Sequence, residues 1–201
     1  MDIFAATREF ERWLGRSVPV VRRDLALKHA RMAEDPFSFF RATFYRAIQQ
    51  WLEVLGDLAK APRLLAVGDL HVENFGTWRD REGRLIWGVN DFDEAWPAAY
   101  TLDLVRLTTS AHLAIREEHL SLTRREAAEA IESGYRDGLG AGGRAFVLAE
   151  EHRWLRLLAL NKLRDPVQFW TKMRQNPPCP AGQAGAARAL IAAALPARRP
   201  H

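Results

Sequence analysis

Two short acidic motifs joined by a β-hairpin pattern constrain this chain more than any other feature. The first motif is Gly68-Asp69-Leu70-His71-Val72-Glu73-Asn74, and the second is Asn90-Asp91-Phe92-Asp93. Residues 75–78 and 84–89 have the pattern of two short strands on either side of a polar turn. Because antiparallel arms fold back on a central turn, we expect Asn74 to lie near Asp91.

The segments around this hairpin are mostly helical in pattern. A short apolar run over 63–67 predicts a buried strand that delivers the first motif to a surface site. Asp35 and Pro36 predict a helix start, and the apolar stripe that follows over 37–55 predicts a helix facing the core. Other helices are predicted over about 3–14, 22–33, 101–118, 123–135, 144–160 and 166–173. We therefore predict a mostly helical α+β fold.

The composition is that of a folded, soluble protein. The chain has 201 residues and 48% hydrophobic content, which is enough for one domain or two small lobes. A single cysteine, Cys179, can form neither an internal disulfide nor a Cys-rich zinc site, so we expect a reducing compartment. The sequence has no secretory leader pattern and no stretch near the roughly 20 apolar residues that span a bilayer. These features favour a cytoplasmic protein without a membrane partner.

Charge is unevenly distributed along the chain. Residues 68–103 carry 3 Lys/Arg against 8 Asp/Glu, whereas the segments before and after them are net basic. One interpretation is chance clustering on solvated faces. The other is a cation site whose basic surroundings suit an anionic ligand such as nucleotide phosphate. Nucleic acid is a weaker option, because no helix-turn-helix, zinc-finger or aromatic-platform signature accompanies the scattered arginines.

The acidic motifs contain the groups that phosphoryl transfer requires. A phosphotransferase of the protein-kinase type needs a carboxylate beside the acceptor hydroxyl and an Asn a few positions on that holds a metal ion. It also needs a second Asp, from a neighbouring strand, that binds Mg²⁺ under the nucleotide phosphates. Asp69, Asn74 and Asp91 offer these groups in that order. The structural alternative is a turn in which Asp69 and His71 form local side-chain hydrogen bonds.

Several blocks of residues resemble known families. The Gly-Asp-Leu-His-x-x-Asn run resembles the catalytic loop of aminoglycoside phosphotransferases and related small-molecule kinases. More closely, the chain resembles the bacterial domain-of-unknown-function 2252 family over about residues 20–175. Four blocks carry this resemblance by their order and spacing: Arg31-Met32 with Pro36-Phe37-x-Phe39-Phe40-Arg41, then Gly68-Asp69-x-His71-x-x-Asn74-Phe75-Gly76, then Asn90-Asp91-Phe92-Asp93-Glu94, then Leu102-Asp103-Leu104-x-Arg106-Leu107.

The resemblance to small-molecule kinases implies a role for each residue of the site. Asp69 would accept or orient the proton of the acceptor hydroxyl, and His71 would lie near the transferred phosphate. Asn74 and Asp91 would hold Mg²⁺ or Mn²⁺, with Asp91 bridging the metal to the phosphates of ATP. The resemblance also implies the C-lobe, or catalytic half, of a protein-kinase-like fold, with the metal site on the short hairpin.

Other residues are expected in supporting positions. Asp103 matches a structural Asp that braces the backbone of the catalytic loop, although it would also suit the first turn of a helix on dipole grounds alone. Asp93 and Glu94 follow the metal-binding Asp and would be second ligands or loop caps. Gly68 and Arg41 lie inside the matching blocks and are expected next to the site.

One departure from the kinase pattern concerns the cover over the phosphates. A kinase also needs a Gly-rich strand-turn and a Lys from a nearby strand. The residues before Gly68 have helical patterns, and their only lysines, Lys28 and Lys60, lie outside any strand pattern. The family resemblance implies that these parts follow the helical segment, and this chain stops where they would begin. We expect a kinase-like lobe over 1–175, a Pro/Gly/Ala-rich tail over 176–201, and little phosphoryl transfer from this chain alone.

Three functions follow from these patterns. The leading hypothesis is the catalytic half of a kinase-like phosphotransferase that acts with Mg-ATP on an unidentified small-molecule or protein hydroxyl. A second is a non-catalytic kinase-like module that binds a metal or nucleotide and acts through its surfaces. A third is a metal-dependent phosphohydrolase using Asp69, His71 and Asp91, which is disfavoured because the sequence offers no further His/Asp pair with two-metal spacing.

Overall fold

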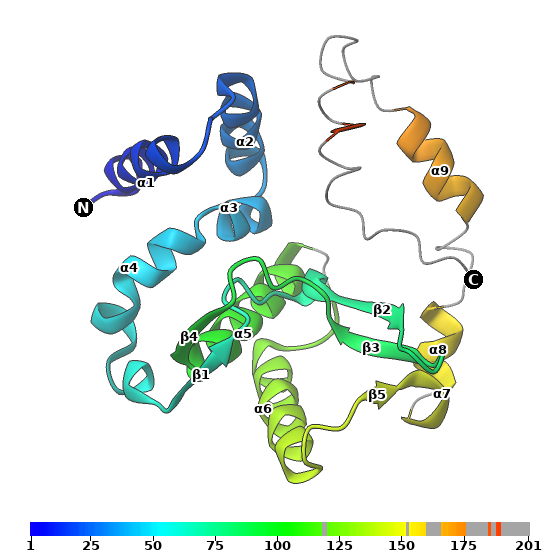
Figure 1. The fold of residues 1–201 in the computed structure, drawn as a ribbon. Helices are drawn as coiled ribbons and strands as arrows, with labels where there is room; N and C mark the ends of the chain where they lie inside the picture. The colour runs from blue at the N-terminus through cyan, green and yellow to red at the C-terminus, as the bar shows by residue number, and fades with distance from the viewer. Residues whose placement is uncertain (118–119, 152, 160–165, 176–184, 186–187, 190–201) are drawn as a thin grey trace. The chain divides into compact units, whose positions relative to one another are not determined.

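The computed structural model describes residues 1–117, 120–151, 153–159, 166–175, 185 and 188–189 (Figure 1). The chain divides into two units, Met1–Glu151 and His152–His201, and every residue proposed above for the site belongs to the first. None of the described helices has the length and apolar character needed to cross a membrane. The tail predicted over 176–201 lies almost entirely outside the described residues, so its boundary stays a prediction.

The first unit begins with helices and continues through alternating strands and helices. The helices before the strands are α1 (Ile3–Ser17), α2 (Arg22–Glu34), α3 (Pro36–Ala42), α4 (Phe44–Leu55) and the 3₁₀ helix η1 (Gly56–Lys60). Those among and after the strands are the 3₁₀ helix η2 (Val72–Asn74), α5 (Thr101–Glu117), α6 (Arg124–Gly140) and α7 (Leu148–Glu151). The second unit contributes α8 (Arg153–Ala159) and α9 (Pro166–Arg174).

The helix predicted over 37–55 is divided in two at Thr43. This residue leaves helical geometry, with φ −114° and ψ 26°, and its hydroxyl donates to the carbonyl oxygen of Phe39 at 2.7 Å. A Thr side chain that bonds back to the carbonyl four residues earlier bends a helix. Asp35 caps α3 as predicted, because its carboxylate accepts from the backbone N–H of Ser38 at 2.6 Å.

The apolar stripe of this segment is not part of the core, which corrects the prediction. Neither α3 nor α4 contains a buried residue, and Ile48 is 45% exposed. Phe40, Trp51 and Leu55 of the stripe line an open groove of about 780 Å³, which Val105 of α5 also lines. The groove leaves these side chains half-buried.

The strands are β1 (Arg63–Ala66), β2 (Phe75–Arg79), β3 (Leu85–Val89), β4 (Trp96–Ala99) and β5 (Phe146–Val147). In the described part of the chain they form two small antiparallel sheets, with β1 beside β4 and with β3 between β2 and β5 (Figure 1). The fold is therefore mostly helical α+β, as predicted.

The predicted hairpin is confirmed. β2 and β3 pair with Phe75 opposite Val89. The N–H of Asn90 donates to the carbonyl oxygen of Asn74 at 3.0 Å, which extends the ladder by one step beyond the strands. Asp91 therefore directly follows a residue that is bonded to Asn74, as expected from two arms that fold back on a central turn.

Two predictions for the segments that form β1 and β5 were wrong. β1 is not buried: Leu64 is 49% and Leu65 71% exposed, and only Ala66 is buried. β1 belongs to a sheet of only two strands, which buries little of its side-chain surface. The segment predicted as one helix over 144–160 begins instead with β5, where Val147 lies opposite Ile86 of β3. A β-branched pair across a ladder favours the strand.

Candidate functional site

Antiparallel pairing of β1 with β4 brings the two acidic motifs together. The first motif follows β1 and the second precedes β4, and Ala66 lies opposite Trp96 at this end of the sheet. Gly68 has φ 95°, and a Cβ at this position would collide with the carbonyl oxygen of Glu94. The two loops are thus in backbone contact. Sequence reasoning missed this pairing because Pro97 argues against a strand in the sequence that forms β4.

Asp103 braces the loop that follows β1. It lies in the first turn of α5, and its two carboxylate oxygens accept from the backbone N–H groups of Val67 at 2.7 Å and Gly68 at 2.9 Å. Burial raises the pKa of this carboxyl group, while the two N–H donors lower it. The contact implied for Asp103 by the kinase resemblance is therefore present.

Asp69 is held by a buried arginine to which the sequence analysis gave no role. The guanidinium of Arg106, one turn after Asp103 on α5, forms an ion pair with Oδ1 of Asp69. Arg106 is 5% exposed, and its guanidinium lies 3.6 Å from the ring centroid of Phe40 and 5.2 Å from that of Phe44. Burial lowers the pKa of Arg106 to about 10, so the group remains charged at neutral pH. The spacing of three residues between Asp103 and Arg106 places both on one helix face, and this was the sequence signal that could have pointed to Arg106.

His71 and Asn74 are buried inside the loop. The backbone N–H of His71 donates to Oδ1 of Asn74 at 2.6 Å, and the N–H of Asn74 donates to the carbonyl oxygen of His71 at 2.9 Å. Val72 donates its N–H to Oγ of Ser110 on α5 at 3.1 Å. His71 is 2% exposed. The amide oxygen of Asn74 is thus engaged within the loop.

A cavity of about 460 Å³ lies against the two motifs. Four carboxylates in or directly after the two motifs contribute to its lining, and we call them the acidic wall: Asp69, Asp91, Asp93 and Glu94. The structure therefore brings Asp69 and Asp91 to one cavity. His71, Asn74, Gly68 and Asp103 are not part of the lining and lie in or behind the loop.

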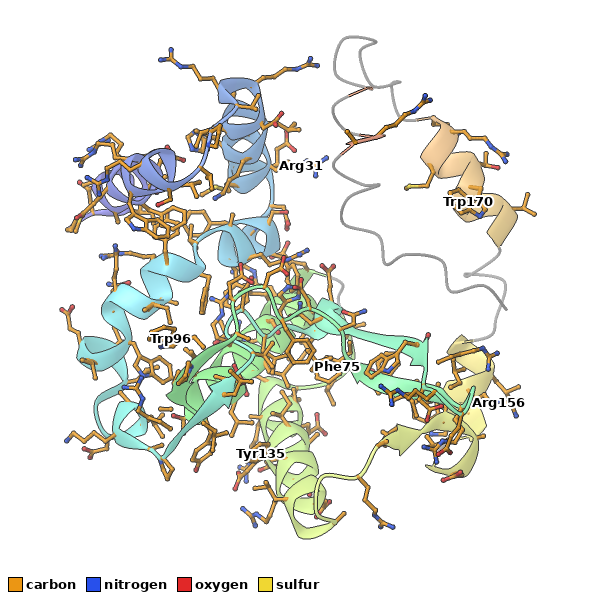
Figure 2. All side chains as sticks on the ribbon, viewed as in Figure 1. Arg31, Phe75, Trp96, Tyr135, Arg156 and Trp170 are labelled. Carbon is orange, nitrogen blue, oxygen red and sulfur yellow. The ribbon has the colours of Figure 1, made fainter. Side chains whose placement is uncertain are left out.

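Three cations from α2 and α3 also line this cavity, and we call them the basic wall: Lys28, Arg31 and Arg41. The sequence predicts Arg41 near the site, whereas it gives Lys28 no role there because Lys28 lies outside any strand pattern. Arg31 belongs to one of the family-like blocks but was given no role. Figure 2 shows the Arg31 side chain extending from α2. A charged side chain on a distant helix reaches this cavity only through tertiary packing, and the sequence pattern contained no signal for it.

The charges of this region act on one another. Burial raises the pKa of Glu94, and the neighbouring carboxylates of Asp91 and Asp93 raise it further. Burial lowers the pKa of His71 to about 4, with Arg41 lowering it and Asp91 raising it. Within the described residues, no group of three or more His, Cys, Asp or Glu side chains is arranged to hold a metal ion.

Gly68→Ala should destabilise the protein, because the new methyl group meets the backbone of Glu94 and φ is positive. We expect the free energy of unfolding to fall by about 1–3 kcal/mol in urea titrations. Gly134→Ala is the matched control: it lies in α6 with open space around it, and it should stabilise by about 1 kcal/mol. Equal effects of the two substitutions would contradict the contact between the loops.

The buried His71 should make stability depend on pH. Its folded pKa of about 4 lies below the ordinary value of 6.5, so the unfolded chain binds the extra proton between these values. The stabilisation is fully present above pH 6.5 and is lost as the pH falls towards 4, by on the order of 3 kcal/mol. Urea titrations across this range should show the slope in the native chain and in His112→Gln, but not in His71→Gln. An unchanged slope in His71→Gln would refute this prediction.

Comparison with known proteins gives one match. Residues 20–165 match the model of a family described as an uncharacterized protein conserved in bacteria (DUF2252). No curated protein and no solved structure was found to match the chain. The matched residues include both walls of the cavity, the braced loop and the arginine that holds Asp69. The chain belongs to the DUF2252 family.

Proposed function

We propose that this chain carries the acceptor-side and metal-binding groups of a kinase-like phosphotransferase that works with Mg-ATP. One observation carries the proposal: Asp69 and Asp91, from two separate motifs, line the same cavity. The contact of Asp103 with the backbone of the first loop supports it, because that brace is what the kinase resemblance implies. Phosphoryl transfer depends mainly on such fixed positions and charges.

Asp69 is the group that would orient the acceptor hydroxyl. Its hydrogen bond from Arg106 uses Oδ1, and Oδ2 accepts no hydrogen bond from another described residue, so Oδ2 is the oxygen left for the acceptor proton. Arg106 is fixed by its stacking on Phe40. The carboxylate is therefore held in one orientation at the cavity, which is the requirement for a positioned base.

Asp91 is the principal metal ligand in this proposal. Mg²⁺ is usually bound by one or two carboxylates together with waters and substrate phosphates, so it does not need a ready-made cluster of three protein ligands. Asp93 and Glu94 add negative charge beside Asp91, and the pKa of Glu94 is raised first by burial and then by repulsion from Asp91 and Asp93. A bound cation would relieve this repulsion. Asn74 would act mainly by closing the loop, since its amide oxygen accepts from His71.

A non-catalytic module that binds a metal or nucleotide is the second candidate. It is favoured by the ion pair itself, because a carboxylate neutralised by a buried guanidinium is a weaker proton acceptor. The phosphohydrolase alternative has less support. His71 would have to reach the substrate, yet it is almost fully buried and does not line the cavity.

Mn²⁺ binding, measured by water-proton relaxation, tests the metal site. Asp91→Ala should weaken binding by at least about tenfold. Asp93→Ala should have a smaller effect, because the kinase-type ligand is the Asp that precedes the aromatic residue. An equal loss in the two variants would mean that the ligand is wrongly assigned. No loss in either would leave the hairpin with a purely structural role.

Turnover separates the two candidates. This chain alone is expected to show little transfer, so the assay looks for a small Mg²⁺-dependent release or transfer of the γ-phosphate that falls by about 100-fold or more in Asp69→Asn, while Mn²⁺ binding is retained. Such a loss supports the phosphotransferase, and residual turnover that is unchanged in Asp69→Asn supports the non-catalytic module. Comparing Asp69→Asn with Asp80→Asn, a carboxylate in the β2–β3 turn outside the cavity lining, controls for the general effect of removing one charge.

A further inference from the structure

We propose that the basic wall binds the phosphate groups of a metal-complexed polyphosphate, the chemistry that ATP and inorganic tripolyphosphate share. Lys28 and Arg31 of α2 would contact phosphate oxygens together with Arg41 of α3, and the metal would bind at Asp91. This inference rests on the proposed function and extends it. It assigns to a helix the phosphate contacts that protein kinases obtain from a strand Lys.

One face of α2 is directed to the cavity. The α2 residues in the lining fall at helical spacings of three and four, which places them on a single stripe: Asp24, Leu27, Lys28, Arg31 and Met32. Arg23, on the same helix, is outside the lining. This face of α2 therefore presents Lys28 and Arg31 to the cavity, and the carboxylate of Asp24 lies one turn earlier on the helix.

The two walls carry opposite charges but do not pair with each other. Among the described residues, no ion pair joins Lys28, Arg31 or Arg41 to a carboxylate of the acidic wall. Arg41 pairs instead with Glu73 at 3.1 Å, and Lys28 Nζ lies 5.6 Å from the ring centroid of Phe10. The Arg31 side chain forms no hydrogen bond or ion pair with another described residue. Opposite charges that do not pair with each other across one cavity leave room for a ligand that carries both signs.

A metal-bound polyphosphate is such a ligand. Its cation suits carboxylates, and its phosphate oxygens suit ammonium and guanidinium groups, of which Arg can bind two oxygens at once. A volume of about 460 Å³ is within the range of small-molecule sites. Neither wall alone would select this ligand, because the acidic wall repels free phosphate and the basic wall repels a free metal ion.

Titration calorimetry of the whole chain with Mg-tripolyphosphate and with MgATP tests the proposal. Lys28→Gln and Arg31→Gln should each weaken binding by about tenfold, the loss expected for one charge-assisted contact. Arg23→Gln is the matched control: it removes the same charge from the same helix outside the lining and should change affinity less than about twofold. Arg31→Lys keeps the charge and should retain most of the affinity.

The outcomes separate this inference from the proposed function. Equal loss in Arg23→Gln and Arg31→Gln would overturn it, since the effect would then be nonspecific attraction. Unchanged polyphosphate affinity in Lys28→Gln and Arg31→Gln, with Mn²⁺ still bound through Asp91, would also overturn the inference. This result would leave the metal site supported. Failure of the native chain to bind Mn²⁺, with polyphosphate binding retained, would instead count against the metal site. Tighter binding of MgATP than of Mg-tripolyphosphate, lost in the same two variants, supports the inference and identifies a nucleotide as the source of the phosphates.

Discussion

One face of α5 holds the first acidic motif in place, and the rest of the site depends on these contacts. Asp103 accepts from the backbone of Val67 and Gly68, Arg106 pairs with Asp69, and Ser110 accepts from the N–H of Val72. Positions 103, 106 and 110 share one helix face. A single helix thus positions successive parts of the loop, and removing one partner of the buried ion pair would cost about 3–5 kcal/mol.

The second acidic motif is positioned by strand pairing rather than by a helix. Its residues lie between β3 and β4, and the β1–β4 pairing places Glu94 against Gly68. At the other end of the loop, Asn90 bonds to Asn74 across the hairpin. The carboxylates after Asn90 are therefore held between two sets of backbone contacts. Rigid placement of acidic groups beside a cavity is a requirement of metal-assisted phosphoryl transfer and of metal binding alike.

The cavity between the acidic wall and the basic wall links the architecture to the proposed chemistry. The braced loops supply negative charge, and α2 and α3 supply positive charge from a part of the chain that has no strand. In the proposed function, Lys28 would take the place of a strand Lys, since it lines the cavity from a helix. Turnover would then require Asp69 to act while it is paired with Arg106, and phosphate binding would depend on the basic wall.

The sequence by itself determined the local features: the β2–β3 hairpin, the cap at Asp35 and the order of the two acidic motifs, because turn residues, caps and periodicity act within a few residues. Only the tertiary structure decided which of these residues meet. The pairing of β1 with β4 is obscured by Pro97, and the engagement of Asn74 within its loop and the pairing of Asp69 with Arg106 depend on partners brought together by packing. The exposure of a side chain also depends on tertiary packing, since Leu65 is apolar yet 71% exposed while its neighbour Ala66 is buried.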